Sequence, residues 1–403
     1  MTAARRDGWW IVAGLFLVLT VSSGFGFYNF SVYISVLAAA RDFTVAEVSV
    51  AVSLFFVVGG VAGMVVARLI DRFDVRWIMV CGALLGGIAL AGAGRATQLW
   101  QLYCLFAVFG IGNSAVSLIP ATTLITRWFP GRNRSVALSI ASTGLSMGGV
   151  AVTPVSAWLL RVLGVETSLT WFGAAFFVLV VPVALGIVRA APPATDTSTP
   201  RPSDGRDWTY AEAVRSRFFV LVTTGYVLCM GAQVGGISHL YSRAVQIADV
   251  TVAAGTVQAL TIMSITGRFF GGWVVTRVPL RSFMLINVTG QALGLSVLAQ
   301  AQAPWQLLLG AGLFGATVGN LLMLQPLWLA DAFGERAYPR AFALSNALSV
   351  IGVAAGPTLL GVLFEGFGYG IAYFGAVSVS LAAGITLFSA GAAPRRTIAK
   401  ELV

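Results

Sequence analysis

The amino-acid sequence predicts an all-α polytopic membrane protein with twelve transmembrane helices. The chain of 403 residues is 58% hydrophobic and 10% charged, whereas soluble domains carry about 25% charged residues. Its mean hydropathy is +0.87. Twelve apolar segments are each long enough to cross a hydrocarbon core of about 30 Å, which requires about 20 residues. Because lipid satisfies no backbone hydrogen bonds, we expect every crossing to be helical.

One polar stretch separates these segments into two groups of six. The predicted crossings are 9–37, 44–69, 75–94, 99–126, 135–160, 168–188, 218–241, 250–276, 283–299, 305–329, 341–364 and 369–388. The stretch 190–217 is rich in Pro, Ser and Thr and predicts a cytoplasmic linker. We therefore expect an N-terminal six-helix bundle at 1–189 and a C-terminal six-helix bundle at 218–403.

The basic residues predict the orientation of the chain. Of the 25 Lys and Arg residues, twenty fall on the tail, the even-numbered loops and the C-terminal segment. Four fall on the opposite side (Arg41, Arg95, Arg161 and Arg243), and Arg268 lies inside a crossing. By the positive-inside rule, both termini face the cytoplasm in the cytoplasmic (inner) membrane. The net charge of +10 is then explained by topology, and we expect no nucleic-acid partner.

Two basic loops repeat at the same place in the two halves. Arg72 and Arg76 follow the second crossing, and Arg277 and Arg281 follow the eighth, 205 residues later in each case. Paired six-helix halves are typical of transporters that rock around a site at the midplane of the membrane. We predict a cytoplasmic gate formed by Asp71 with these four arginines.

Arg268 is the fixed charge within the apolar segment 250–276. It precedes the next basic residue by nine positions, which places it roughly 13 Å inside the membrane. A guanidinium at that depth costs at least ~2.5 kcal/mol and stays charged. Thr261, Ser264 and Gly271 share its helix face, and no acid does. The sequence predicts that Arg268 binds an anionic ligand, and the alternative is a structural arginine that binds carbonyls of a neighbouring helix.

The remaining reactive side chains point to no catalytic chemistry. Cys81, Cys104 and Cys229 lie inside apolar segments without disulfide or metal spacing. His239 is the single histidine and is placed by the sequence at an outward helix end. We expect no metal, no cofactor and no enzyme active site.

Three short stretches resemble a known family. Residues 71–76 read Asp-Arg-Phe-Asp-Val-Arg and are similar to the Asp-Arg-x-Gly-Arg loop of the major facilitator superfamily, with Asp74 at the inner Gly position. Residues 7–10 resemble the opening of monocarboxylate transporters. Residues 127–134 read Arg-Trp-Phe-Pro-Gly-Arg-Asn-Arg and resemble a signature of monocarboxylate transporters and oxalate/formate antiporters. The resemblance implies the major facilitator fold, in two pseudo-symmetric six-helix bundles.

The resemblance also implies candidate binding residues. Arg268 stands at the position of the family's substrate-binding arginine. Asn346 stands where the oxalate carrier has a lysine, and a single fixed charge suits a monocarboxylate better than a dicarboxylate. Helices 1, 4, 7 and 10 line the cavity in this superfamily. The further candidate contacts are Tyr28, Asn113, Ser117, Gln233 and Asn320, each of which could equally serve helix packing.

The function implied is secondary active transport of small monocarboxylates such as lactate or pyruvate, coupled to protons by symport. Ser264 replaces the aspartate that animal carriers place before the arginine, so their coupling residues do not transfer. Asp249, which opens the helix of Arg268, is the candidate for proton coupling. The alternatives are an oxalate/formate-type carboxylate antiporter and a non-transporting membrane sensor. We expect a functional monomer whose partners are a small carboxylate, protons and the lipid bilayer.

Overall fold

The computed structural model describes residues 3–70, 72–129, 133–188 and 208–394, and in these residues it contains helices and no strands. The elements are α1 (Ala3–Ser23), the π-helix η1 (Gly24–Tyr28), α2 (Phe30–Arg41), α3 (Val45–Ile70), α4 (Val75–Ala93), α5 (Leu99–Ser114), α6 (Leu118–Trp128), α7 (Asn133–Gly186), α8 (Tyr210–Arg215), α9 (Arg217–Val245), α10 (Val250–Val274), α11 (Leu280–Gln300) and α12 (Pro304–Ala390).

The described helices account for the twelve predicted crossings. Ten apolar helical stretches are long enough to span a membrane, and two of them, Val136–Gly186 and Arg340–Ala390, are 51 residues long. A straight helix of that length would extend roughly 75 Å, about twice the span of a bilayer. Gly164 (φ 75°) and Gly368 (φ 79°) interrupt these two stretches. Glycine adopts positive φ without a Cβ clash, so each long stretch turns back and crosses twice.

Two predicted crossings are interrupted inside the bundle. The first consists of α1, η1 and α2, and the side chain of Asn113 packs against Gly26 of η1. The fourth is divided into α5 and α6 at residues 115–117, just before Pro120. A proline fits the first turn of a helix, where its missing N–H has no partner to lose, so it favours a new helix start there.

The predicted linker 190–217 contains a short helix near its end. Residues 210–215 form the short helix α8, and Thr209 and Glu212 cap it reciprocally through side chain and backbone. This Thr-x-x-Glu pattern is a capping box that the sequence displays. The rest of the linker, 190–207, lies outside the described residues.

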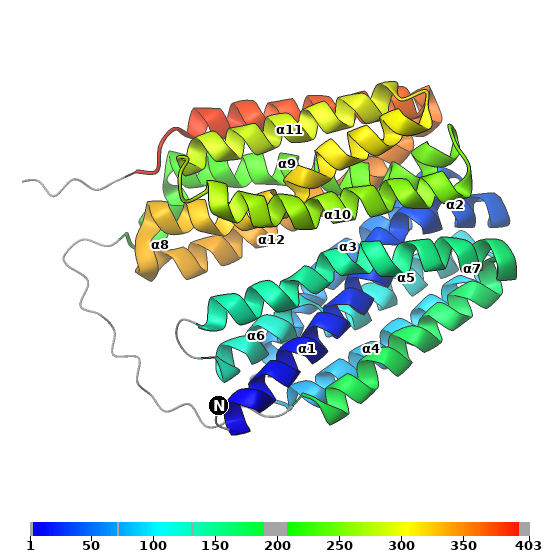
Figure 1. The fold of residues 1–403 in the computed structure, drawn as a ribbon, viewed down its shortest axis with the longest axis horizontal. Helices are drawn as coiled ribbons and strands as arrows, with labels where there is room; N and C mark the ends of the chain where they lie inside the picture. The colour runs from blue at the N-terminus through cyan, green and yellow to red at the C-terminus, as the bar shows by residue number, and fades with distance from the viewer. Residues whose placement is uncertain (1–2, 71, 130–132, 189–207, 395–403) are drawn as a thin grey trace, which may run out of the picture.

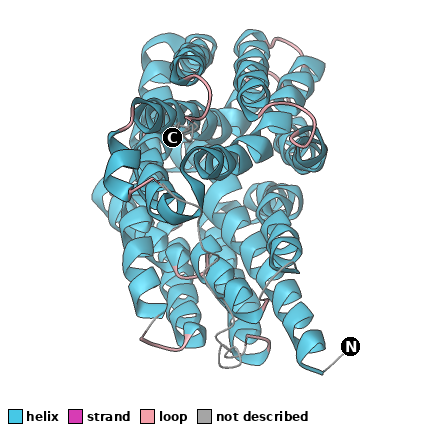
Figure 2. Cartoon of the chain, turned by 90° about the vertical axis from the view of Figure 1, so that its left-hand side faces the viewer, coloured by secondary structure: helices cyan, strands magenta, loops and turns pink. Residues whose placement is uncertain are grey.

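The two groups of helices meet closely at one end of the molecule. In Figure 1 the first six crossings lie below the last six, they meet near α2, and they diverge toward α8 and the N-terminus. Figure 2, turned by 90°, shows a helical assembly with short loops. We call the end with α8 and the loops 72–74 and 275–279 the basic end, and the end with the turns 42–44, 94–98 and 246–249 the sparse end.

Hydrogen bonds between the halves cluster toward the sparse end. Ser53 Oγ and Thr358 Oγ1 lie 2.6 Å apart, and the backbone N–H of Ala46 donates to Glu365 Oε1 at 2.7 Å. One hydrophobic core also runs through both halves, whereas a second core, between residues 213 and 387, belongs to the C-terminal half alone. The structure therefore has a sealed sparse end.

Candidate functional site

Arg268 lies on α10 between the two halves and is half-buried. Its Nη1 donates to the backbone carbonyl of Ser142 on α7 at 3.4 Å. That separation exceeds the usual 2.7–3.2 Å range of N–H···O bonds. Its Nε is buried and has no hydrogen-bond partner among the described residues. The guanidinium is therefore only weakly satisfied by the protein.

Small residues pack against the aliphatic part of the Arg268 side chain. Gly319 of α12 packs so closely that a Cβ there would lie 3.0 Å from Arg268 Nε and 2.6 Å from the carbonyl oxygen of Ser264. Ser264 itself is fully buried, and its hydroxyl has no partner among the described residues. Two unsatisfied donors, one helical turn apart, thus lie on the same face of α10.

Tyr28 reaches the same place from the first crossing. It is 4% exposed and interacts electrostatically with Arg268, and its hydroxyl lies beside the side chain of Ser146 on α7. Gly149 of α7 lies directly against the ring of Tyr28 and the methyl group of Thr261. The structure therefore brings Tyr28 and Arg268 together and packs α7, η1 and α10 tightly on their sparse-end side.

No carboxylate among the described residues pairs with Arg268. The two described ion pairs, Arg76 with Asp74 and Arg95 with Glu166, both lie at helix ends. A buried charge without a partner is strongly unfavourable, so the site favours an added anion. A carboxylate can take two parallel hydrogen bonds from one guanidinium.

The predicted contacts on the fourth crossing have structural partners. Asn113 Oδ1 accepts a hydrogen bond from Ser22 Oγ at 2.8 Å, which ties the fourth crossing to the first. Ser117 donates to the carbonyl of Ser114 at 2.8 Å and precedes α6. Neither has a direct hydrogen bond to Arg268 in the structure, and both stay predictions as substrate contacts.

The three predicted substrate contacts of the C-terminal half differ in their burial and in their hydrogen bonds. Gln233 is 1% exposed, and its Oε1 has no partner among the described residues. Asn320 donates to Asn287 Oδ1 at 3.0 Å and packs against Gly271, so it joins α10, α11 and α12. Asn346 is exposed. Their roles in binding stay predictions as well.

Asp249 occupies the N-cap of α10, where its side chain accepts the backbone N–H of Val252 at 2.8 Å. It is exposed and lies nineteen residues from Arg268, which corresponds to roughly 28 Å along the helix. This position gives Asp249 a local capping role, and its role in proton coupling stays a prediction.

The predicted gate residues lie at the basic end, and the structure describes no hydrogen bond or ion pair that joins them across the halves. Arg76 pairs with Asp74 at 3.2 Å, Arg277 stacks on Trp273 at 4.0 Å, and Arg281 donates to the carbonyl of Phe388 at 2.9 Å. Arg72 is exposed, and Asp71 lies outside the described residues. The gate stays a prediction for a state in which this end is closed.

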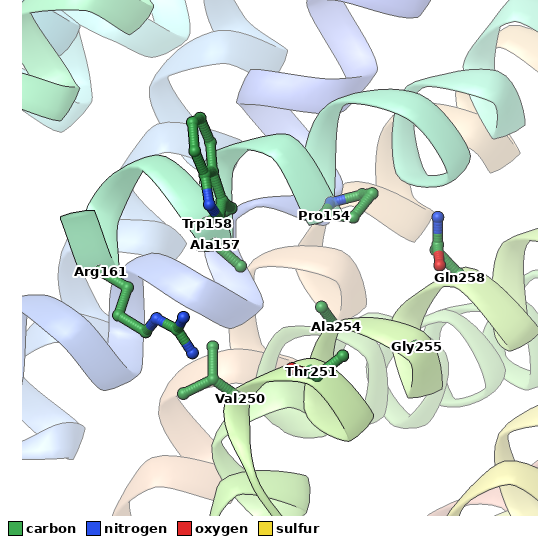
Figure 3. A pocket seen from close by; sticks show the side chains of 9 residues that line it. All are labelled: Pro154, Ala157, Trp158, Arg161, Val250, Thr251, Ala254, Gly255 and Gln258. Atoms are coloured by element: carbon green, nitrogen blue, oxygen red, sulfur yellow. The ribbon is translucent and has the colours of Figure 1, made fainter. Parts of the chain in front are cut away.

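A separate cavity of about 200 Å³ lies between α7 and α10 near the sparse end (Figure 3). Its lining residues are Pro154, Ala157, Trp158, Arg161, Val250, Thr251, Ala254, Gly255 and Gln258. Gln258 precedes Arg268 by ten residues, roughly 15 Å along α10. The cavity is therefore distinct from the Arg268 site.

Sequence reasoning missed the partners on α7 and misplaced one residue. The Ser142 contact is made by a backbone carbonyl, which no side-chain pattern reveals. Ser146 stands in a Ser- and Gly-rich run that signals close helix packing without singling out one serine. His239 lies six residues inside the end of α9, is fully buried, and bonds across to α3. The expectation of a helix-end position for His239 was wrong because α9 extends to Val245.

Comparison with known proteins places this fold in a family. The profile of the Major Facilitator Superfamily matches residues 16–300 and, in a second match, residues 248–401. Monocarboxylate transporter 13 of Rattus norvegicus is 24% identical over 391 residues, which cover 94% of this chain and 87% of that protein. The uncharacterized MFS-type transporter YhjX of Escherichia coli K12 is 24% identical over 73% of this chain and 72% of its own length.

Solved structures show the same architecture. A bacterial homolog of the human lysosomal transporter Spinster, in an inward-facing and occupied conformation, gives a TM-score of 0.78 at 17% identity, over 99% of this chain and 100% of that one. A mutant of the nucleoside transporter NupG gives 0.72 at 13% identity, over 94% of this chain and 100% of that one. With both halves matched in sequence and the architecture shared, this multi-pass membrane protein belongs to the Major Facilitator Superfamily.

Proposed function

We propose that this transporter carries small monocarboxylates, of the lactate or pyruvate type, by alternating access with proton symport. The observation that carries the proposal is Arg268: a half-buried guanidinium between the halves, with a free Nε, one long bond to a carbonyl and no carboxylate partner among the described residues. The likeness to monocarboxylate transporter 13 over nearly the whole chain supports the same substrate class.

In this proposal the substrate carboxylate takes paired hydrogen bonds from Arg268, and the unpartnered Ser264 hydroxyl, one helical turn away, donates beside it. Tyr28 covers the ligand from the sparse side, where Gly149 and Thr261 leave no space. The carboxylate neutralises the guanidinium, so that the halves can close around a neutral pair in low dielectric. Loaded carrier then interconverts between its two states more readily than empty carrier.

The proposed orientation follows from the charge distribution. The basic end carries the loops with most of the arginines and faces the cytoplasm of the inner membrane, together with both termini. In this orientation the sealed sparse end faces outward. The structure then corresponds to a state that releases substrate into the cytoplasm.

Transport in proteoliposomes tests the function. An inward proton gradient is expected to drive labelled lactate into empty vesicles, and Arg268→Gln is expected to remove this uptake because the guanidinium supplies the paired bonds. Arg95→Gln is the matched control. Arg95 forms an exposed ion pair with Glu166 at the sparse end, and exposed ion pairs contribute little to the stability of a fold, so this variant should transport normally. Uptake by Arg268→Gln at the wild-type rate would contradict the proposal.

Exchange of the oxalate/formate type is the second candidate. It is favoured by the lack of any carboxylate near Arg268 among the described residues, because a symporter needs a titratable group linked to substrate. The same vesicles distinguish the two. Symport fills empty vesicles, whereas exchange requires an anion trapped inside.

A further inference from the structure

His239 is the single histidine of the chain and is completely buried in α9. Its Nε2 lies 2.9 Å from the carbonyl oxygen of Pro357 and 3.2 Å from Ser49 Oγ. Its Nδ1 lies 3.3 Å from the hydroxyl of Tyr369. Pro357 and Tyr369 belong to α12, whereas Ser49 belongs to α3 of the other half. Both ring nitrogens are therefore engaged, and one of them reaches across the interface.

These bonds assign the neutral tautomer with its proton on Nε2. A carbonyl oxygen only accepts, so Nε2 must donate to Pro357. The Ser49 hydroxyl already donates to the carbonyl of Val45 at 2.6 Å, so it too presents a lone pair to Nε2. Nδ1 is left without a proton and accepts from the Tyr369 hydroxyl. The sealed arrangement thus satisfies a neutral imidazole completely.

The ring lies within the contacts that seal the sparse end. Ser242, one turn along α9, donates to the carbonyl of Ser31 on α2 at 3.4 Å. Ser53, one turn along α3 from Ser49, pairs with Thr358 at 2.6 Å. A change in the charge of His239 therefore acts directly on the interface between the halves.

Among the described residues, the groups that face His239 offer no counterion. On its own helix, Arg243 is one turn away, and its guanidinium donates to the carbonyls of Leu298, Ala299 and Ala301. On α12 the ring faces Tyr369, and Tyr373 lies one turn further along the helix. α3 presents Ser49, and α2 presents its backbone to Ser242. Glu47 lies two residues before Ser49, and Glu365 lies four residues before Tyr369. Their carboxylates accept the backbone N–H groups of Thr44 and Ala46, respectively, at the start of α3.

Protonation would disrupt this arrangement in two ways. A proton on Nδ1 would point at the Tyr369 O–H, which must then turn its hydrogen away. The imidazolium would also be a buried charge close to Arg243 and without a carboxylate among the described residues, which is strongly unfavourable. Separation of α3 from α9 and α12 would admit water to the charged ring and relieve both problems.

We propose that His239 is a proton-binding site that opens the sparse end: the neutral ring stabilises the seal, and the imidazolium favours the state open at that end. Histidine is the side chain whose ordinary titration range lies between about pH 5 and 8. Its place in a transport cycle rests on the proposed function, whereas opening on protonation does not. In the proposed orientation, external acid would expose the carboxylate site to the outside.

Thiol accessibility tests this directly and without any substrate. Cys81, Cys104 and Cys229 are replaced by alanine, and Ser53→Cys reports on the seal through its reaction with a membrane-impermeant maleimide. The exposed position Thr97→Cys normalises for the effect of pH on thiol reactivity. Between about pH 7.5 and about pH 5.5, on either side of the ordinary histidine pKa of about 6.5, we expect normalised labelling to rise about threefold or more. In His239→Gln, which keeps a neutral donor, we expect it to stay flat.

Two tyrosine variants make a matched pair. Tyr369→Phe removes the hydroxyl that donates to Nδ1, so protonation becomes easier and the opening should occur at higher pH. Tyr373→Phe is the control, because its hydroxyl donates to Gly236 at 2.8 Å within the C-terminal half, and it should keep the wild-type response. The tyrosine pair also provides a test if His239→Gln does not fold.

The inference is overturned if His239→Gln shows the same acid-induced labelling as the wild type, if the wild type shows none, or if the two tyrosine variants respond alike. The proposed function can fail separately. A protein that opens in acid through His239 but transports no carboxylate would retain this inference and reject the monocarboxylate proposal.

Discussion

Arg268 is held in place by backbone and small residues rather than by an opposite charge. Gly319 lets α12 approach its stem, and the carbonyl of Ser142 accepts its Nη1 at 3.4 Å. Such a site fixes the position of the guanidinium and leaves its bonding capacity for a ligand. The binding strength then depends on how closely α10 and α12 approach each other.

A substitution at Gly319 tests this dependence. In Gly319→Ala the new methyl would lie 2.6 Å from the Ser264 carbonyl oxygen and 3.0 Å from Arg268 Nε, so α10 must shift. We expect the KM for lactate to rise about tenfold, since a displaced bidentate pair loses part of its charge-assisted bonding. Gly312→Ala, two turns earlier, meets only Met263 Cγ at 3.6 Å and should behave as wild type. Equal KM values for the two variants would reject the dependence.

For single residues, the sequence predicts a charged side chain inside the membrane at Arg268 but does not predict the residues that contact it. The sequence shows the depth of Arg268 in an apolar segment and the lack of acids on its helix face. Among the described residues no carboxylate pairs with it. The carbonyl of Ser142 and the close approach of Gly319 depend on how distant helices meet. For His239 the sequence indicates no metal or catalytic role, and its contact with Ser49 of the other half depends on how α9 and α3 meet.

α7 and α10 carry the contact between the halves nearest to Arg268. Gly149 of α7 packs against Thr261 of α10 and Tyr28 of η1. Gln258 of α10 donates to the carbonyl of Val150 at 3.0 Å. These contacts close the path from Arg268 toward the sparse end, so this helix pair must separate whenever that end opens.

A large side chain at Gly149 should hold the pair apart. Gly149→Leu would collide with Thr261 and place its Cβ 2.9 Å from Tyr28 Cγ. Overpacking of this kind costs about 1–3 kcal/mol, enough to shift a two-state balance about fivefold or more. We expect faster labelling of the Ser53→Cys reporter at neutral pH. Gly255→Leu on α10, where a Cβ meets nothing within 4 Å, is the control. Unchanged labelling in Gly149→Leu would show that this contact does not maintain the seal.

The sequence predicts helix boundaries well where the length of an apolar segment alone determines them. The second, third and eighth crossings begin and end within two residues of the expected positions. The interruption by η1 could not be read from apolarity, because Gly24 to Tyr28 is as hydrophobic as its flanks. The capping box of Thr209 and Glu212 indicates the start of the short helix α8. The prediction of a linker over the whole of 190–217 follows from its prolines and does not use this signal.

The whole molecule is asymmetric along its long direction, because the halves meet at the sparse end and diverge toward the basic end (Figure 1). Hydrogen bonds join the halves at the sparse end, and none is described between them at the predicted gate of the basic end. A carrier of this kind works because the two ends open in turn. The sealing contacts are then an obligatory but transient part of the cycle, and fixing them should stop transport.

A disulfide across the seal tests this directly. Ser53 Oγ and Thr358 Oγ1 lie 2.6 Å apart, so Ser53→Cys with Thr358→Cys should form a bond on oxidation. We expect oxidation to abolish uptake and a reductant to restore it, while each single variant transports normally under both conditions. A fully cross-linked protein that still transports would mean that the halves need not separate here.

Binding of labelled pyruvate to purified protein, compared between the wild type and Arg268→Gln, addresses the central claim without depending on coupling or orientation. Removal of one partner of a buried charged pair costs about 2–5 kcal/mol, so the account predicts that affinity falls about 30-fold or more. Arg268→Lys should bind weakly, because an ammonium cannot reproduce the paired bonds. Equal affinity in Arg268→Gln and the wild type would contradict the account.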